Sequence, residues 1–529
     1  MIINYLINLV LYFFFYSIFF ISTIGLGCFV KNFFGQRSKE NFFELAIYGL
    51  LFNLVLGFFI YYFFKNSLFF NIFFLTLGCV FYLYFYHSIE NISFKKTIFF
   101  LLLLFSGLLI SKTHEDFPTY HFFSVQQIFE NKLTIGLSLI NFRFTHASLL
   151  SYVQALYVLP FFNYKFIHIP VFFIYISTIG YFLFQYNQSK SKLESFFCFF
   201  VIALTLVKFS RLSEHGYDFP AQFLLFIVFH KLYFFAKKLK EIRKSIIIYL
   251  FAVLIKPISL LFAPLFFYLF FKLKKKAFFL ITKCKLFLFV LSLLTFILIS
   301  SSFVRTGCVF YPINQTCFSK EKIFWSQKQE LENYSKVVTN WAKGFYHQKV
   351  SKYTEINDND IYLKSFNWLK YWIDIHFFYK IFEFLLICLF IFLLIYLTTK
   401  KIKDEKKFNI KDHYLLIFLS LSSVFFWLIT VPQFRFGFSS IVIFCFFGFL
   451  LFLKKELHFK NKQALIFFFF LFAIFNIKNF IRIHSEINRI DEYKFINFPW
   501  YVNKNIKYDQ SKFTVQEGDF IRIIKKNLK

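Results

Sequence analysis

The chain has 529 residues, of which 58% are hydrophobic and 25% aromatic, and its mean hydropathy is +0.59. Many windows of about 18 or more nearly uncharged residues are each long enough to cross a hydrocarbon core about 30 Å thick, which excludes a soluble globular protein. The formal net charge of +32 does not indicate a nucleic-acid partner, because Lys and Arg gather in short loops between apolar runs.

The apolar runs predict an all-α, polytopic integral membrane protein with about 13–14 transmembrane helices and helices in its extracytoplasmic loops. We expect a transmembrane domain over residues 1–482 and an extracytoplasmic C-terminal tail over 483–529. Two short runs meet at Lys256-Pro257, which predicts a broken hairpin whose break lies inside the protein or lines a cavity. The expected spans are 3–30, 42–64, 67–87, 97–111, 166–187, 195–209, 219–236, 245–255, 257–271, 277–302, 379–398, 412–431, 436–453 and 463–481.

Loops rich in Lys and Arg alternate along the chain with loops that carry few charges. By the positive-inside rule the basic loops are expected in the cytoplasm. Residues 145–162 are apolar enough to cross, but a crossing there would break the alternation. Residues 112–165 are therefore expected to form an external region with an amphipathic helix and a segment that dips into the membrane. All polar constellations would then gather on the outer face, together with the long loop 303–378.

The first chemically varied stretch is Lys112–Ser151, which follows four apolar runs and begins with KTHEDFPTYH. Ionisable clusters at a membrane edge point to a functional site. Asp116 is the candidate catalytic carboxylate, either as general base for a hydroxyl acceptor or as metal ligand. His121 is a second catalytic candidate, and Glu115 and Tyr120 are candidate substrate contacts.

A second acidic group repeats part of this pattern, because Asp116-Phe117-Pro118 recurs as Asp218-Phe219-Pro220. Glu214, His215 and Asp218 are expected to bind sugar hydroxyls or to share a divalent cation, Mg²⁺ or Mn²⁺, with Asp116. The alternative is that both aspartates only stabilise helix starts, where an acid faces the positive end of the helix dipole.

Candidate phosphate contacts follow farther along the chain. Arg435 is the one charge between two spans, and its planar guanidinium matches phosphate oxygens. Lys256 is a second candidate at the hairpin break. Their alternatives are a snorkelling arginine and a lysine that merely flanks a helix. Tyr311 is a candidate substrate contact, and Cys308 and Cys317 have a spacing that allows a disulfide in an oxidising compartment but does not require one.

The order of these motifs resembles a group of bacterial multi-pass envelope proteins that is similar to the GT-C glycosyltransferases. The resemblance covers roughly residues 110–440. Two positions depart from the group's pattern, Gln433 where an acid is expected and Thr145-His146-Ala147-Ser148 where Asn-Ser-Ser is expected. The motifs are Asp116-x-x-x-Tyr120-His121, GLSLINFRFTHASLLSY over 136–152, Asp218-x-Pro220, Lys256-Pro257-Ile258-Ser259, RTGCVFYP over 305–312 with WAK over 341–343, and VPQFRFG over 431–437.

This resemblance implies a GT-C-like helical bundle in the bacterial inner membrane, with its active face outside the cytoplasm. Such enzymes take a sugar from a polyprenyl-phosphate carrier and pass it to a glycan or lipid acceptor. Asp116 matches their early-loop carboxylate, and Arg435 matches the arginine that faces the carrier phosphate. The alternatives are a transporter or flippase, or a polymerase, of lipid-linked surface polysaccharide. A transporter would place charged residues along a path through the bilayer.

Overall fold

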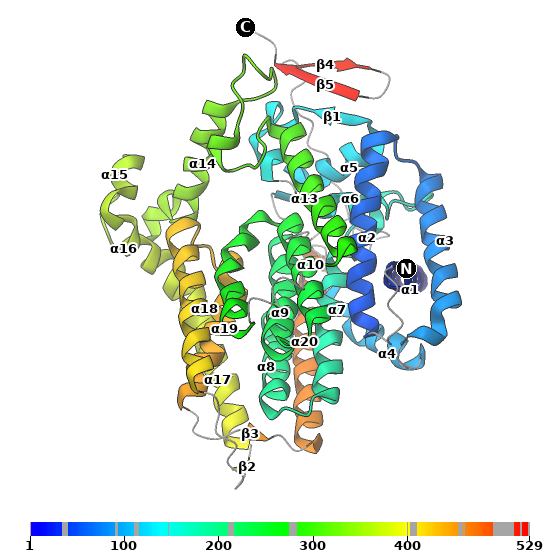
Figure 1. Ribbon diagram of the computed structural model, residues 1–529, viewed down its shortest axis with the longest axis vertical. Helices are drawn as coiled ribbons and strands as arrows, with labels where there is room; N and C mark the ends of the chain where they lie inside the picture. The colour runs from blue at the N-terminus through cyan, green and yellow to red at the C-terminus, as the bar shows by residue number, and fades with distance from the viewer. Residues whose placement is uncertain are drawn as a thin grey trace.

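The computed structural model is a helical bundle, elongated along one axis (Figure 1). It describes residues 2–33, 41–89, 94–109, 116–146, 148–209, 216–273, 283–398, 400–401, 410–452, 457–458, 461–489, 513–518 and 521–526. Its helices are α1 (Ile2–Phe33), α2 (Phe42–Phe63), α3 (Leu68–Phe85), α4 (Phe94–Leu104), α5 (Phe122–Glu130), α6 (Leu150–Ala155), α7 (Ile169–Gln188), α8 (Lys192–Lys208), α9 (Asp218–Phe234), α10 (Leu239–Ile255), α11 (Phe267–Lys272), α13 (Lys285–Thr306), α14 (Lys328–Ala342), α15 (Asn359–Leu363), α16 (Trp368–Trp372), α17 (Glu383–Thr398), α18 (Ile410–Thr430), α19 (Phe434–Phe452) and α20 (Asn461–Arg489).

Within these described ranges, nine helical segments are long and apolar enough to cross a membrane. In hydrocarbon a backbone must satisfy its own polar groups, and a helix does so within one segment. The expected all-α, multi-pass architecture is confirmed. The expected 13–14 spans exceed these nine, because α8, α9 and α10 have only 17 residues each and α4 has 11.

The two ends of the bundle bring together loops that are far apart in sequence. At one end β2 (Lys400–Lys401) pairs with β3 (Leu457–His458), so two of the basic loops meet. At the opposite end β5 (Ile521–Lys526) pairs with β1 (Leu133–Ile135) and with β4 (Phe513–Glu517), as Figure 1 shows. The C-terminal tail is therefore joined to the region 112–165 by a three-stranded sheet.

The region 112–165 contains no spanning helix among its described residues, as expected. Its amphipathic helix is α5, and the apolar stretch 145–162 forms only the six-residue helix α6, which is fully buried. The break at Lys256 is also present. Lys256 has an extended backbone after α10, and the chain continues as the 3₁₀ helix η7 (Pro257–Phe266) before α11.

Close contacts between helix backbones hold α1, α2 and α3 together. A methyl group added at Gly49 of α2 would lie 1.8 Å from the carbonyl oxygen of Thr23 in α1. The same addition at Gly27 would lie 1.9 Å from the carbonyl oxygen of Leu45. Glycine is required at these positions because the backbones touch where a side chain would stand.

The expectation that all polar constellations gather on the outer face was wrong, because a buried ionic cluster lies at the end of the bundle that carries the basic loops. Lys231 of α9 is 1% exposed and pairs with Glu44 of α2 at 3.0 Å and with Glu241 of α10 at 2.5 Å. Lys244 pairs with the same two glutamates, at 3.4 and 3.0 Å. The polar constellations therefore do not all gather at one end of the molecule.

The neighbouring residue on α9 extends this cluster. The ring of His230 is completely buried, and its Nε2 lies 3.1 Å from the carboxylate of Glu194 on α8. Its Nδ1 lies 2.9 Å from the hydroxyl of Tyr181 on α7. Sequence inspection missed the cluster because its members are scattered over the five helices α2, α7, α8, α9 and α10, and only tertiary packing makes them neighbours.

Candidate functional site

The centre of the candidate site is a carboxylate that two cations share. Asp218 lies 2.8 Å from the Nζ of Lys256 through one oxygen and 3.1 Å from the Nε of Arg435 through the other. The three residues come from the start of α9, the break after α10 and the start of α19. The structure thus brings together three of the predicted site residues, although Arg435 follows Asp218 by 217 positions (435 − 218).

Aromatic rings surround the cations. The guanidinium of Arg435 lies over the ring of Trp341, 5.3 Å from its centre, and 5.2 Å from the centre of the Phe436 ring. The ammonium of Lys256 lies 5.7 Å from that same Phe436 ring. Such contacts hold a cation in place without neutralising its charge. The Arg435 side chain is still 36% exposed, so one side of its planar fork faces outward.

A second ion pair lies in the region 112–165. The Nη1 of Arg143 is 3.2 Å from a carboxylate oxygen of Asp116 and donates a hydrogen bond to the Thr119 hydroxyl, also at 3.2 Å. The Asp116 side chain is 27% exposed and that of Arg143 is 44% exposed. Asp116 is therefore accessible from outside, as a carboxylate that meets a substrate must be.

The alternative that these aspartates only stabilise helix starts is supported for Asp218 by its place in the first turn of α9, where an acid faces the positive end of the helix dipole, but neither aspartate caps a helix through its side chain. Asp116 precedes the π-helical turn η3 (Phe117–His121), and its side chain makes no capping hydrogen bond to that turn. Tyr217 occupies the cap position of α9 and also provides no side-chain cap, while Asp218 is the first helical residue. Both carboxylates point instead toward basic side chains.

An aromatic layer links the two ion pairs. The rings of Tyr120 and His121 have centres 4.0 Å apart, and the His121 ring meets the Tyr217 ring edge-on at 4.6 Å. Burial, together with the negative charges of Asp116 and Asp218, holds the pKa of the Tyr120 hydroxyl well above its usual range. Tyr120 is therefore a neutral hydrogen-bond donor, and the charges of both carboxylates act on its hydroxyl group. His121 is buried, so its predicted catalytic role would have to act through its neighbours Tyr120 and Tyr217 and not by direct contact with a substrate.

His146 is a residue that the sequence patterns did not select. Its ring stacks near Tyr311 and Tyr334, with centres 5.3 and 5.6 Å away. Burial, and then the positive charge of Lys256, lower the pKa of His146 to about 3. Its Nε2 is buried without a hydrogen-bond partner. His146 is thus a neutral imidazole with one unsatisfied ring nitrogen close to Lys256 and the predicted contact Tyr311.

Cys308 and Cys317 form the disulfide that their spacing allows. It closes a small loop that contains the cis peptide bond between Tyr311 and Pro312. The loop continues directly from the end of α13, where Gly307 adopts a left-handed conformation that favours glycine. Tyr311 is thereby fixed beside His146.

Three predicted residues, Glu115, Glu214 and His215, lie outside the described part of the chain. Among the described residues, no group of three or more His, Cys, Asp or Glu side chains could hold a metal ion. Asp116 and Asp218, the predicted metal ligands, each have a basic partner where a cation would bind. Glu214 and His215, which complete the predicted ligand set, lie outside the described residues, so the shared Mg²⁺ or Mn²⁺ site stays a prediction.

Arg143 and Trp341 were also missed as site residues. Arg143 lies within the motif over 136–152, but no local sequence pattern connects it with Asp116, which is 27 positions earlier. Trp341 was noted only as part of the WAK motif over 341–343, and its ring covers the guanidinium of Arg435. Gln433 stands where an acid was expected. It is buried and donates to the carbonyl oxygen of Ala342, which ties the Trp341 segment to the start of α19.

The fold and the site together define a multi-pass helical membrane protein with a charged, aromatic-lined site at one end of its bundle. The chain matches the family model described as a domain of unknown function (DUF8201) over residues 9–442, and it belongs to that family. No curated protein and no solved structure matches the chain.

Proposed function

We propose that this protein is a GT-C-like glycosyltransferase that moves a sugar from a polyprenyl-phosphate carrier to a glycan or lipid acceptor outside the cytoplasm. The observation that carries the proposal is the ion pair of Asp218 with both Lys256 and Arg435, within the same end of the bundle as Asp116. One part of this site suits a phosphate, and the other offers a carboxylate to a hydroxyl group.

The phosphate side consists of Arg435 and Lys256. Asp218 holds the Nε of Arg435, and Trp341 covers its ring face, so the guanidinium is oriented before a ligand arrives. Its remaining N–H groups match two phosphate oxygens. When the sugar leaves the carrier, negative charge develops on that phosphate. Cations that are already in position stabilise this charge without reorganisation.

The acceptor side consists of Asp116 and its neighbours. In the proposed step the acceptor hydroxyl loses its proton to Asp116 while its oxygen bonds to the anomeric carbon of the sugar. The bond between that carbon and the carrier phosphate oxygen breaks, and its electron pair stays on the phosphate. Arg143 holds the Asp116 carboxylate in position, and Tyr120 supplies a neutral hydroxyl beside it. A general base of this kind typically contributes about 10²–10⁴-fold to the rate.

Two further observations support an extracytoplasmic site in the inner membrane. The nine apolar helices give the site a lipid environment through which a polyprenyl chain can reach it. The Cys308–Cys317 disulfide lies in the loop beside the site, and disulfides persist mainly in oxidising compartments. The described free cysteines lie on the helices of the bundle or directly before one.

A transporter or flippase of lipid-linked glycans is the second candidate, and one observation favours it. Helix α9 carries Asp218 at its first residue and the buried pair His230 and Lys231 near its last turn. A transporter would place charged residues along a path through the bilayer, and α9 carries them at both of its ends. A transporter would move its lipid substrate without forming a new glycosidic bond.

The test uses the native host, with Asp116→Asn and Arg435→Gln variants expressed at the wild-type level. We expect each variant to lose at least about 100-fold of the transfer of one envelope sugar. The measurement is the composition of surface glycans and of lipid-linked sugar intermediates. Asp360→Asn and Lys328→Ala serve as matched controls, because both side chains are exposed and lie outside the site.

The expected result is an accumulated sugar-loaded carrier together with an unmodified acceptor. Unchanged glycans in both variants, at normal protein levels, would refute the transferase proposal. If the linkages remain intact but the glycan is retained at the inner leaflet, the transporter is favoured instead. In that case we also expect Lys231→Met, which changes neither Asp116 nor Arg435, to leave the glycan at the inner leaflet.

A further inference from the structure

The exposed side of Arg435 has a basic neighbour that does not belong to the site described above. Lys380 lies in the π helix η11 (Ile373–Phe382), which leads directly into α17. Its side chain is exposed. A π helix is rare and is frequent at functional sites, and η11 packs against the start of α19, where Arg435 lies.

Contacts on either side of Lys380 fix the face of the helical segment on which it lies. His376, four positions before Lys380, has its ring Nε2 3.2 Å from the Nε2 of Gln433. Phe384, four positions after Lys380, has its ring centre 4.8 Å from that of Phe434. Residues four positions apart share one face of a helix, so Lys380 lies on the face that packs against residues 433–434, directly before Arg435.

The charges of Lys380 and Arg435 therefore act on each other. Two neighbouring cations repel each other, and an anion between them offsets this repulsion. The nearby carboxylates have other partners, because Asp218 binds the Nε of Arg435 at 3.1 Å and Glu383 binds the Nζ of Lys208 at 3.4 Å. Among the described residues, no carboxylate forms an ion pair with Lys380. The two cations are thus arranged to share an anionic ligand.

This pair of cations is accessible from the bilayer. The Arg435 side chain is 36% exposed, and Lys380 is exposed as well. Phe378, Tyr379 and Phe382, the neighbours of Lys380 in η11, are 54%, 66% and 44% exposed. Exposed aromatic side chains beside a lysine are typical of a helix at the boundary between membrane and water. A phosphate group on a lipid can therefore reach Lys380.

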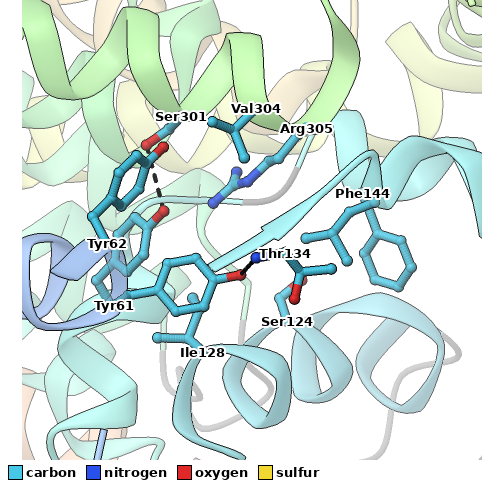
Figure 2. A pocket seen from close by; sticks show the side chains of 11 residues that line it. Tyr61, Tyr62, Ser124, Ile128, Thr134, Phe144, Ser301, Val304 and Arg305 are labelled. Carbon is cyan, nitrogen blue, oxygen red and sulfur yellow. Dashed lines mark hydrogen bonds between the residues drawn. The ribbon is translucent and has the colours of Figure 1, made fainter. Parts of the chain in front are cut away.

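Another basic residue, Arg305 near the end of α13, does not meet these conditions. Figure 2 shows its guanidinium in a small pocket beside Tyr61 and Thr134. This pocket has room for about one water molecule. The buried Arg305 lies 6.0 Å from the centre of the Tyr152 ring. Arg305 is thus enclosed within the protein, whereas Lys380 can extend the phosphate side of the site.

We propose that Lys380 is a third phosphate-binding residue and that the site takes a lipid diphosphate rather than a monophosphate. The side chains of Arg435, Lys256 and Lys380 carry three positive charges. Asp218 carries one negative charge, so two positive charges remain. A diphosphate that links a lipid to a sugar carries two negative charges, and the corresponding monophosphate carries one. The charge of these four residues therefore matches the diphosphate.

The assignment of this diphosphate to the sugar donor rests on the proposed transferase function, whereas its binding does not. In that function the bond between the anomeric carbon and the phosphate oxygen breaks, and its electron pair stays on the lipid diphosphate. Arg435 and Lys256 hold the phosphate that the sugar leaves, and Lys380 holds the phosphate that carries the lipid. The third cation stabilises the charge that spreads onto the second phosphate.

The test measures ligand binding to the purified full-length protein in an uncharged detergent at constant ionic strength. The probes are a short-chain prenyl monophosphate and the prenyl diphosphate of the same chain length, and calorimetry gives both dissociation constants. We expect the wild-type protein to bind the diphosphate at least about 10-fold more tightly, because one further charge-assisted contact forms. Lys380→Gln is expected to weaken diphosphate binding about 10-fold and monophosphate binding less than about 2-fold.

Two variants control for the charge and its position. Lys380→Arg keeps the charge and should keep the preference for the diphosphate. Lys370→Gln removes a positive charge ten positions earlier, from an exposed lysine whose Nζ lies 5.1 Å from the centre of the Tyr353 ring, and should bind both probes as the wild type does. Inorganic pyrophosphate is a third probe. Weaker binding than that of the prenyl diphosphate supports a lipid ligand, and equal binding contradicts it.

The proposal is overturned if the wild-type protein binds neither prenyl probe or binds both equally. It is also overturned if Lys380→Gln keeps the wild-type preference, as a lysine that only anchors η11 at the membrane boundary would allow.

These outcomes are distinguishable from failure of the transferase proposal. Diphosphate binding that depends on Lys380, together with intact envelope glycans in the Asp116→Asn and Arg435→Gln variants, would support the diphosphate site and remove its assignment to a sugar donor. Lost glycans in those two variants, together with an unchanged preference in Lys380→Gln, would support the transferase and overturn the role of Lys380.

Discussion

At the scale of single residues, the candidate site depends on how Asp218 is partnered. A buried carboxylate beside one lysine would form an ordinary ion pair, and the pair would have no charge left for a ligand. Asp218 is instead shared between Lys256 and Arg435, so the three residues carry a net positive charge. This surplus, together with the outward face of Arg435, is the reason to expect an anionic substrate rather than a purely structural pair.

Replacement of Asp218 by Asn is expected to destabilise the protein. The change leaves two cations close together in a largely buried place, and removal of one partner from a buried ion pair costs about 3–5 kcal/mol. The measurement is the thermal unfolding midpoint in detergent, with Asp360→Asn as the exposed control. The double variant Asp218→Asn with Lys256→Met should recover part of the loss. A midpoint equal to that of the control would show that Asp218 does not hold the cations in place.

At the scale of elements, short and irregular segments position the site, while the long helices only carry it. Asp116 directly precedes the turn η3, which ends at His121. His146 ends the turn η5 (Phe142–His146), and Lys256 lies at a break between helices. Arg435 and Asp218 lie at helix starts. Irregular backbone at membrane depth is tolerated where it is buried in protein or lines a cavity. The regular helices α1, α2 and α3 pack closely against one another through their backbones.

Replacement of Gly49 by Ala is expected to separate α1 from α2. The new methyl group would lie 1.8 Å from the Thr23 carbonyl oxygen, which is rigid backbone. Overpacking of this kind typically costs about 1–3 kcal/mol. Gly448→Ala in α19 is the matched control, because nothing lies within 4 Å of its added methyl group. The unfolding midpoint should fall for Gly49→Ala and stay equal or rise for Gly448→Ala; the opposite order would contradict the described helix contact.

At the scale of the whole molecule, charge is distributed over two ends. One end holds the Asp218 site, the disulfide and the three-stranded sheet, and the other holds β2, β3 and the buried cluster around Lys231. Since Glu44, Glu241 and Lys231 come from three helices, this cluster fixes the spacing of α2, α9 and α10. An intramembrane cluster of this kind also deserves a functional test, which the Lys231→Met variant provides.

The two ends are expected to face opposite sides of the membrane. Single cysteines at Lys237, in a basic loop, and at Lys328, at the start of α14, report on the two sides. Both positions are exposed, and Cys79 and Cys284 are first replaced by Ser because they are partly accessible. A membrane-impermeant maleimide added to intact cells should label Lys328→Cys and reach Lys237→Cys only after permeabilisation. Labelling of both positions from one side would refute the single-face site.

Much of the membrane architecture could be predicted from sequence because hydrophobic length is a local property. The multi-pass helical class and the break at Lys256 follow from runs of apolar residues and their interruptions. The absence of a crossing over 145–162 follows from the alternation of basic loops. The number of spans could not be predicted reliably, since α8, α9 and α10 have 17 residues each and are close to the length limit.

The candidate site could be predicted only in part. Four charged residues could be recognised as site candidates because each stands beside an apolar run, where a charge costs free energy. They are Asp116, Asp218, Lys256 and Arg435. Their partners were not recognisable in the same way. Arg143, His146 and Trp341 lie in segments that are already polar or aromatic, where one more such residue carries no local signal.

The sequence by itself determined that the chain enters a bilayer many times and which of its segments carry chemistry, because solvation by lipid acts on each segment separately. Only the tertiary structure decided how these charges are paired. It joined Asp218 to both Lys256 and Arg435, joined Asp116 to Arg143, and collected Glu44, Lys231 and Glu241 at the far end. The physical reason is that Coulomb energy depends on distances between side chains, and those distances exist only after the helices have packed.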